Sequence, residues 1–224
     1  MEVVPLGDSA LLVRATGTSS ASDVTALDLA RRLQAPAIRG VIDVVPAYTS
    51  VAIFFDASTS AFENLNEQIA LALTGKAPDA ARASSQRTIE IPVCYDRELA
   101  PDLGEVAEHV GLAPAEVVAR HSSADYCVAC IGFTPGFPYL SGLPGELAMP
   151  RRATPRKEVP AGAVAIGGNQ TGIYPQKSPG GWNIIGRTPV RLFAPDRGQP
   201  ALLRAGDFHS YVVSIRASAA ETSA

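Results

Sequence analysis

Residues 132–144 read Gly-Phe-Thr-Pro-Gly-Phe-Pro-Tyr-Leu-Ser-Gly-Leu-Pro, and the same mixture of glycine, proline and aromatic residues continues to Pro189. The segment 132–189 holds 11 Gly and 9 Pro in 58 residues, more than half of the chain's 19 Gly and 18 Pro taken together. Aromatic residues are interleaved with them, whereas disordered segments are poor in aromatic residues. We therefore expect this stretch to be folded and to contain many tight turns.

Short apolar runs separate these turns. They lie at 163–166, 183–185 and 190–192, and two more follow at 202–203 and 211–215. Short strands joined by tight turns are typical of a β-barrel. The sequence therefore predicts a β-barrel in the C-terminal half of the chain.

The region before this segment predicts a strand, two helices and another strand. The first strand is expected at 88–93. A helix is expected over 102–111, with the Asp102 carboxylate as its N-terminal cap and a glycine at its end. A second helix, with proline in its first turn, is expected over 114–121, followed by a strand at 126–131.

The first 75 residues alternate strand and helix patterns. The order is β-β-α-β-β-α, which predicts a small α/β sandwich with helices on one face of a sheet. Strands are expected at 3–4, 11–13, 41–45 and 50–55, and helices at 22–34, with Ser22 as its cap, and at 62–75.

The composition of residues 76–87, rich in Ala, Ser and polar groups, is typical of a linker. The predicted fold class is therefore α+β. It comprises an α/β sandwich domain at 1–75, a linker at 76–87, a β-barrel domain at 88–217 and a disordered tail at 218–224.

Composition and charge exclude several classes of function. Hydrophobic residues make up 46% of the chain and charged residues 18%, as in ordinary globular proteins. The formal net charge of −3 gives no field that recruits nucleic acid. The sequence has no apolar run of about 18 residues that would span a membrane, and no basic signal-peptide start. We therefore expect a cytoplasmic protein that binds neither nucleic acid nor membrane.

Three cysteines, Cys94, Cys127 and Cys130, are too few for a disulfide framework. The last two form a Cys-x-x-Cys pair inside a predicted strand, where side chains three apart point to opposite faces. A zinc site also needs four ligands, and no second close pair is visible. The sequence thus contains no metal motif.

Basic residues concentrate in the segment 151–191. It holds seven Lys and Arg against the single acid Glu158, so it carries +6 within a chain of −3. The planar guanidinium fork of arginine binds carboxylates and phosphates in a bidentate manner. The segment favours a small anionic substrate, although a solvated basic face or a docking surface for an acidic partner has the same pattern.

The run Gly167-Gly168-Asn169-Gln170-Thr171-Gly172 is neither a P-loop nor a dinucleotide-binding fingerprint. His121 is a candidate general acid or base, because histidine titrates near neutral pH. The alternative is that His121 satisfies the dipole at the C-terminus of its helix. No serine-hydrolase motif is present, so a self-contained hydrolase of that type is not expected.

Long motifs in this sequence resemble those of one family. They are the opening stretch 132–144, Pro-Arg-Arg-Ala-Thr-Pro-Arg at 150–156, Gln-Thr-Gly-Ile-Tyr-Pro at 170–175 and Ser-Pro-Gly-Gly-Trp-Asn-Ile-Ile-Gly-Arg-Thr-Pro at 178–189. The chain is similar, over residues 3–216, to the B subunit of 5-oxoprolinase, also called KipI or allophanate hydrolase subunit 1, with a carboxyltransferase C/D-like domain.

The resemblance implies that the barrel is cyclophilin-like. It also implies two partners. One is the large subunit, known as the C subunit of 5-oxoprolinase, KipA or allophanate hydrolase subunit 2, and the other is the A subunit of 5-oxoprolinase. Together they would hydrolyse 5-oxo-L-proline to L-glutamate with consumption of ATP, and the chain alone would be inactive. The sequence does not indicate which of the three chains binds ATP.

Within that hypothesis, residue chemistry assigns site roles. The lactam oxygen would be phosphorylated, and His121, Asn169 and Gln170 are the candidate catalytic residues. The backbone amides of 167–168, the side chains of Asn169 and Gln170 and an arginine would stabilise the developing oxyanion. Arg156 is the expected partner of the substrate carboxylate. The remaining expected substrate-binding residues are Phe137, Gly167, Gly168, Tyr174, Ser178 and Trp182.

Two alternatives from other functional classes remain open. One is a carboxyltransferase or hydrolase component acting on allophanate or urea, which would depend on a biotin carrier. The other is a binding module that inhibits a histidine kinase, as KipI-like proteins do. Peptidyl-prolyl isomerase activity would rest on analogy of fold alone.

Overall fold

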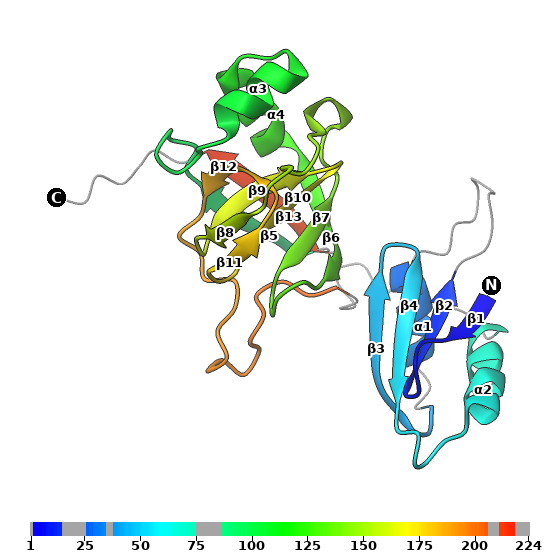
Figure 1. Ribbon diagram of the computed structural model, residues 1–224. Coiled ribbons are helices and arrows are strands. Elements are labelled where there is room, and N and C mark those ends of the chain that lie inside the picture. Colours follow the sequence, from blue (N-terminus) through cyan, green and yellow to red (C-terminus); the bar gives the residue numbers. More distant parts are fainter. Residues whose placement is uncertain (1, 15–25, 35–37, 75–86, 206–210, 218–224) are drawn as a thin grey trace. The chain divides into compact units, whose positions relative to one another are not determined.

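The computed structural model describes residues 2–14, 26–34, 38–74, 87–205 and 211–217 (Figure 1). The chain divides into two compact units, Met1–Ser85 with Ala205–Ser210 and Gln86–Arg204 with Tyr211–Ala224. No helix in these described ranges is long and apolar enough to cross a membrane.

The first unit is a four-stranded antiparallel sheet with two helices. Its sheet order is β1-β2-β4-β3, and the helices α1 and α2 follow β2 and β4 in the chain. This is the predicted order β-β-α-β-β-α. The elements are β1 Glu2–Pro5, β2 Ala10–Arg14, α1 Ala26–Gln34, β3 Val41–Ala47, β4 Ser50–Phe55 and α2 Phe62–Thr74.

Helical spacing of apolar residues builds the core of this unit. In α1, Ala26, Leu29, Ala30 and Leu33 are buried, which is the i, i+3, i+4, i+7 stripe of a helix that packs on a sheet. Both helices contribute to one hydrophobic cluster with β2, β3 and β4. The residue expected to cap α1, Ser22, lies outside the described residues.

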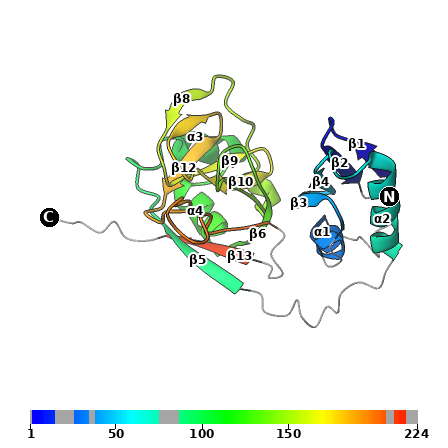
Figure 2. The same ribbon diagram turned by 90° about the horizontal axis from the view of Figure 1, so that it is seen from below.

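The second unit is built around a seven-stranded sheet of order β12-β9-β10-β7-β6-β13-β5. The last strand of the chain, β13, lies between β6 and β5 and runs parallel to β5, as the red and green strands of Figure 2 illustrate. A separate pair is formed by β11 and β8. The strands are β5 Arg87–Val93, β6 Asp125–Ile131, β7 Pro138–Ser141, β8 Arg156–Val159, β9 Ala163–Gly167, β10 Gln170–Ile173, β11 Ser178–Gly180, β12 Asn183–Arg187 and β13 Tyr211–Ala217.

Two helices and a short turn of 3-10 helix complete this unit. They are α3 Leu103–Val110, α4 Pro114–Ser123 and η2 Gly145–Leu147. Gly111 ends α3 with φ 67°, the left-handed conformation that favours glycine at this position. The predicted cap is wrong, because Asp102 makes no side-chain hydrogen bond to α3. Its carboxylate is used elsewhere.

The predicted closed barrel needs correction. Among the described residues, β12 and the residue that follows β5 share one isolated bridge, between Arg187 and Cys94, instead of a continuous ladder. The reason lies at Ile184, whose N–H donates to Asp102 and whose carbonyl accepts from the Asp102 N–H. The approach to α3 thus occupies the free edge of β12, and the cyclophilin-like barrel is not confirmed.

Two further expectations differ from the structure. Residues 190–192 do not form a strand, because the Val190 N–H bonds the Thr188 hydroxyl and this segment continues as a loop. Residues 202–203 are also irregular. The tail at 218–224 and the linker at 76–87 lie outside the described residues, except that Arg87 begins β5.

Burial predicts a clear difference between two neighbouring positions of α2. Ile69 is fully buried in the core cluster, whereas Leu71 is 73% exposed. We expect Ile69→Ala to lower the free energy of unfolding by about 2–5 kcal/mol, because it leaves a cavity. Leu71→Ala, the control in the same helix, should change it by no more than about 0.5 kcal/mol. Urea unfolding followed by far-UV circular dichroism measures both, and equal effects would contradict this packing.

Candidate functional site: an aromatic cavity beside a buried ion cluster

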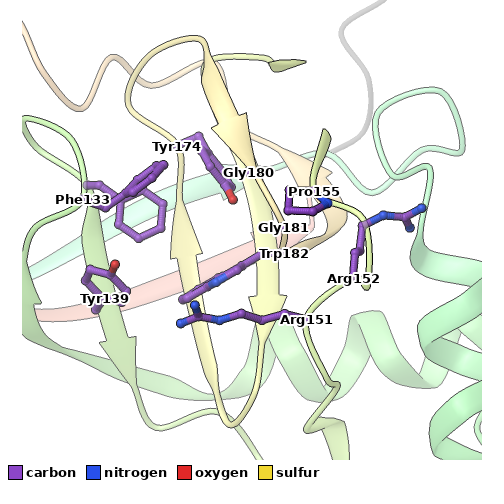
Figure 3. Close-up of a pocket in the computed structure, with 10 residues that line it drawn as sticks. Phe133, Tyr139, Arg151, Arg152, Pro155, Tyr174, Gly180, Gly181 and Trp182 are labelled. Atoms are coloured by element: carbon purple, nitrogen blue, oxygen red, sulfur yellow. The ribbon is translucent and has the colours of Figure 1, made fainter. Parts of the chain in front are cut away.

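A cavity of about 190 Å³ opens in the second unit, where the β6–β7 loop meets the loops around β11 and β12. Figure 3 shows its lining residues, most of which are aromatic or basic. A volume below the roughly 300–1,000 Å³ of drug-sized pockets suits a small ligand. The lining residues are Phe133, Phe137, Tyr139, Arg151, Arg152, Pro155, Tyr174, Gly180, Gly181 and Trp182.

Phe137 is the centre of the aromatic wall. Its ring makes edge-on contacts with Tyr139, Tyr174 and Trp182, at centroid distances of 4.9, 5.1 and 5.7 Å. Edge-to-face packing of this kind stabilises ring pairs by about 0.5–1.5 kcal/mol beyond the area they bury. The wall is therefore a rigid, preformed surface.

Phe133 stands at the mouth of the cavity on a constrained loop. The loop is closed by hydrogen bonds from Gly132 N to Phe137 O (3.1 Å) and from Phe137 N to Thr134 O (3.0 Å). Phe133 has φ 65°, which is uncommon for a residue with a side chain and marks backbone held by its surroundings. Its ring is 59% exposed yet contacts Phe137 and Tyr174.

Glycine lets the backbone approach the indole of Trp182. A Cβ atom at Gly167 would lie 2.5 Å from the Trp182 ring, and one at Gly172 would lie 2.9 Å from Phe137. At Gly180 a Cβ would collide with the Tyr174 hydroxyl. Side chains at these positions would displace the aromatic wall.

Arg151 supplies the positive charge of the cavity. Its Cζ lies 5.7 Å from the centroid of the Trp182 ring, a cation–π contact. In the described part of the chain, no carboxylate lies within salt-bridge distance of this guanidinium. Figure 3 shows its side chain running beneath Trp182 toward Tyr139. The guanidinium thus remains able to bind an anion.

The two tyrosines of the wall act as neutral hydrogen-bonding groups. Burial raises the pKa of Tyr139 and of Tyr174 above its ordinary value. For Tyr174, a hydrogen bond with the Trp182 backbone and the positive charges of Arg151 and Arg156 offset part of that increase in pKa. Both phenols are protonated at neutral pH, so neither is a base.

A buried ion cluster lies behind the cavity. The carboxylate of Asp102, only 1% exposed, accepts from Arg156 Nη2 at 2.6 Å and from Arg152 Nη1 at 2.9 Å. Its other oxygen accepts from Ile184 N at 2.6 Å. Arg156, the predicted partner of a substrate carboxylate, is therefore already paired and does not line the aromatic cavity. Its substrate-binding role stays a prediction that these contacts do not support.

His121 lies in a different, fully buried polar network. Its Nδ1 is 2.8 Å from the Tyr95 hydroxyl and its Nε2 is 3.0 Å from the Thr171 hydroxyl. The Thr171 hydroxyl donates to Ala165 O, so it accepts from Nε2, and Nδ1 accepts from Tyr95. Burial lowers the pKa of His121 to about 3, so the ring is neutral.

This network bears on both interpretations of His121. A neutral ring at physiological pH supplies no positive charge to the dipole of α4. Both ring nitrogens are occupied, and His121 does not line the aromatic cavity. The contacts describe a structural residue, and the predicted catalytic role has no support among them.

The other predicted residues divide into two groups. Phe137, Tyr174 and Trp182 meet in the cavity, and Gly167 packs beneath the indole. By contrast, Gly168 and Asn169 form the exposed turn between β9 and β10, and Gln170 begins β10 half-buried. Ser178 lies on β11, where its buried Oγ makes no hydrogen bond with the described residues.

The cysteines lie outside the cavity, with Cys127 and Cys130 in β6 and Cys94 directly after β5. Along β6, Tyr126, Val128 and Cys130 are buried while Cys127 is only partly buried, so the predicted alternation of faces is confirmed. Burial raises the pKa of Cys127 and of Cys94. Within the described residues, no group of three or more His, Cys, Asp and Glu side chains is arranged to hold a metal ion.

Several residues of the site are not predicted as site residues from the sequence. Phe133 and Tyr139 belong to the opening motif 132–144, which was a usable signal. Arg151 was counted among the basic residues, but nothing in the sequence separated it from Arg152 or Arg156. Asp102 was assigned to a helix cap, because its true partners are about 50 to 80 residues away.

Comparison with known proteins assigns the chain to a protein family. The family model described as "Carboxyltransferase domain, subdomain C and D" matches residues 1–203. The chain therefore belongs to this family, together with relatives named as the B subunit of 5-oxoprolinase. One of these, from Bacillus subtilis, is 39% identical over 223 residues and covers 94% of this chain and 92% of its own. Another, from Haemophilus influenzae, is 41% identical, covering 95% and 98%.

Solved structures agree with this family. A crystal structure of TTHA0988 has a TM-score of 0.75 at 35% identity, and it covers 96% of this chain. The chain spans only 41% of that protein. The urea carboxylase of Kluyveromyces lactis, at 18% identity and a TM-score of 0.74, covers 98% of this chain and 22% of its own, which shows likeness of fold alone.

The close packing beneath Trp182 makes Gly167 sensitive to substitution. We expect Gly167→Ala to shift the emission of Trp182, the single tryptophan of the chain, and to lower stability by about 1–3 kcal/mol. Gly145→Ala is the matched control, since a Cβ there meets no atom within 4 Å. Tryptophan fluorescence and thermal unfolding measure the two effects. An emission spectrum like that of the wild type would contradict the close approach.

The low pKa of His121 makes stability depend on pH. The folded pKa of about 3 lies below the ordinary 6.5, so between these values the unfolded chain binds one more proton. The contribution is fully present above pH 6.5 and is lost on acidification, by up to about 1.4 kcal/mol per pH unit. Urea unfolding at about pH 7.5 and about pH 5 should show a smaller decline for His121→Gln than for the wild type. The exposed His109, changed to Gln, is the matched control; a wild-type decline in His121→Gln would contradict the assignment.

Proposed function

We propose that the chain is a subunit of an ATP-dependent 5-oxoprolinase, which hydrolyses 5-oxo-L-proline to L-glutamate with a large subunit and a third subunit. Relatives of nearly full length that are named as the B subunit of 5-oxoprolinase support this proposal. The observation that carries it is the small aromatic cavity with the Arg151 guanidinium on its wall. The cavity would hold the substrate.

The chemistry of the substrate fits this cavity. 5-Oxoproline is a small flat lactam with one carboxylate, so it needs apolar walls for the ring and one cation for the charge. Phe137 and Trp182 offer the walls, and Arg151 offers a charge not neutralised by a described carboxylate. The tyrosine hydroxyls can bond the lactam N–H and carbonyl oxygen.

The cavity lacks the groups needed to complete the reaction. An amide carbonyl resists attack by water, and phosphorylation of the lactam oxygen by ATP would make it electrophilic. Water would then add to the carbonyl carbon, and the ring C–N bond would break as its nitrogen takes up a proton, which leaves an acyl phosphate. A second water would hydrolyse this acyl phosphate to the carboxylate and inorganic phosphate. Among the described residues, no carboxylate, histidine or cysteine lines this cavity. The base and the phosphate-binding groups would come from the other subunits, so the isolated chain would be inactive.

The predicted oxyanion site at 167–170 needs revision within this proposal. The Gly168 N–H already donates to Met149 O at 2.7 Å, so it is not available to a developing charge. Asn169 is exposed at the turn, and neither it nor Gln170 lines the cavity. Their catalytic roles stay predictions, and a partner chain seated over the turn would be needed to bring them into use.

Arg151 gives the sharpest test of the substrate pocket. In the reconstituted enzyme of three chains, Arg151→Ala should raise KM for 5-oxoproline roughly tenfold to a hundredfold, because a charged hydrogen bond contributes about 1.5–3 kcal/mol. Arg191→Ala is the control from the same basic segment, since Arg191 is largely exposed and pairs with Asp196. ATP-dependent glutamate release at varied substrate concentration measures KM. An unchanged KM in Arg151→Ala would remove the substrate from this cavity.

The same reconstitution tests the function itself. The three chains, each folded, should release glutamate only with ATP present. Biotin-dependent activity on urea or allophanate would favour the carboxyltransferase alternative instead. Tight binding to a histidine kinase dimerisation domain without the large subunit, and no glutamate release, would favour the inhibitory binding module.

A further inference from the structure

We propose that Asp102 is a positioning residue that holds Arg151 against Trp182 and so keeps the anion-binding arm of the cavity in place. The expected effect on substrate binding rests on the proposed function, whereas the role of Asp102 in placing Arg151 rests on geometry alone. Asp102 does not line the cavity; it acts through the two segments that carry Arg151 and Trp182.

The Asp102 carboxylate contacts both segments. Its Oδ1 accepts from Arg152 Nη1 at 2.9 Å, and Arg152 is the next residue after Arg151. Its Oδ2 accepts from Ile184 N at 2.6 Å, two residues after Trp182. The Asp102 N–H also donates to Ile184 O at 3.0 Å. Asp102 therefore fixes the spacing between the two halves of the cation–π pair.

The backbone that carries Arg151 is irregular. Residues 150–155 form no strand or helix. This segment lies beside 181–183 through two hydrogen bonds, from Asn183 Nδ2 to Pro150 O and from Arg152 N to Gly181 O, both 2.8 Å. Arg151 stands between these two bonds and faces the indole. Its neighbour Arg152 forms an ion pair with Asp102, which among the described residues is the ion pair that joins this segment to a buried carboxylate.

The burial of the Asp102 charge has an energetic consequence. A buried carboxylate costs several kcal/mol in lost hydration unless it is paired, so Asp102 requires its donors. Arg152 Nε and Arg156 Nη1 are buried without a hydrogen-bond partner among the described residues, and the other carboxylate paired with Arg152, that of Glu105, is 64% exposed. Removing the charge of Asp102 therefore leaves Arg156 without its carboxylate partner and Arg152 with an exposed, weak one. The segment 150–152 then keeps its two hydrogen bonds to 181–183 but loses its ion pair with the buried carboxylate.

The test uses Asp102→Asn, which keeps the size of the side chain and removes its charge. Because Trp182 is the single tryptophan, its emission reports the position of Arg151 without any ligand. We expect Asp102→Asn to reproduce the emission change of Arg151→Ala. In the reconstituted enzyme it should raise KM for 5-oxoproline about tenfold or more with a smaller change in kcat, since loss of positioning weakens binding.

Two further variants separate positioning from folding. Glu105→Gln is the matched control, because Glu105 also pairs with Arg152 but is 64% exposed, and exposed pairs contribute little. Arg152→Gln cuts the link from the other side and leaves the contacts of Asp102 with Arg156 and Ile184. It should give the same emission change as Arg151→Ala, so the positioning role is tested even if Asp102→Asn folds poorly.

The outcomes are decisive in each arm. The double variant Asp102→Asn/Arg151→Ala should have the same KM as Arg151→Ala, since both act on one contact. Additive effects, or wild-type emission in both Asp102→Asn and Arg152→Gln, would overturn the inference. Unchanged emission in Arg151→Ala would overturn its premise. If the wild-type complex releases no glutamate, the proposed function fails, and the fluorescence arm still decides the positioning role.

Discussion

The buried carboxylate of Asp102 is the interaction on which the second unit depends. It lies where three parts of the chain meet: the start of α3, the edge of β12 and the irregular segment that precedes β8. A charge with 1% exposure is tolerated only with complete pairing, so these parts cannot move apart without leaving it unsatisfied. The same contact explains why the sheet ends at β12 instead of closing into a barrel, and why the cavity lies at this edge.

The aromatic wall follows a different rule, that of close packing. Its rings touch edge to face around Phe137, and glycine at three positions beneath them removes the side chains that would push the rings outward. The density of glycine in 132–189 therefore serves the cavity as well as the turns. Proline adds stiffness, because it fixes one backbone angle in the loops that carry these rings. The cavity is thus built before any ligand arrives.

Local patterns predicted much of the fold. The helix α1, the strand Ser50–Phe55 and the glycine that ends α3 are predicted from the sequence, because neighbouring residues determine them. Phe137, Tyr174 and Trp182 were also predicted as site residues, since buried aromatics in a glycine-rich segment have few other uses. The failure at Asp102 arises from partners fixed by tertiary structure, whereas the failure at 190–192 is local, because the Val190 N–H bonds the Thr188 hydroxyl. A capping pattern at Asp102 looks identical in sequence whether the carboxylate binds its own helix or arginines 50 residues away.

The two buried polar centres of this unit show why the candidate chemistry lies at the aromatic cavity. His121 is neutral, and each of its ring nitrogens has a hydroxyl partner, so the network is closed and has no capacity left for a substrate. In the ion cluster, the guanidinium groups of Arg152 and Arg156 are paired with the Asp102 carboxylate. Of the arginines around the cavity, Arg151 alone keeps its charge for an incoming group, within the described residues. Among the described residues, a site with one available cation and two protonated phenols is suited to bind and orient a small anion. Under the proposed function, the groups that cleave the amide would therefore come from the other chains.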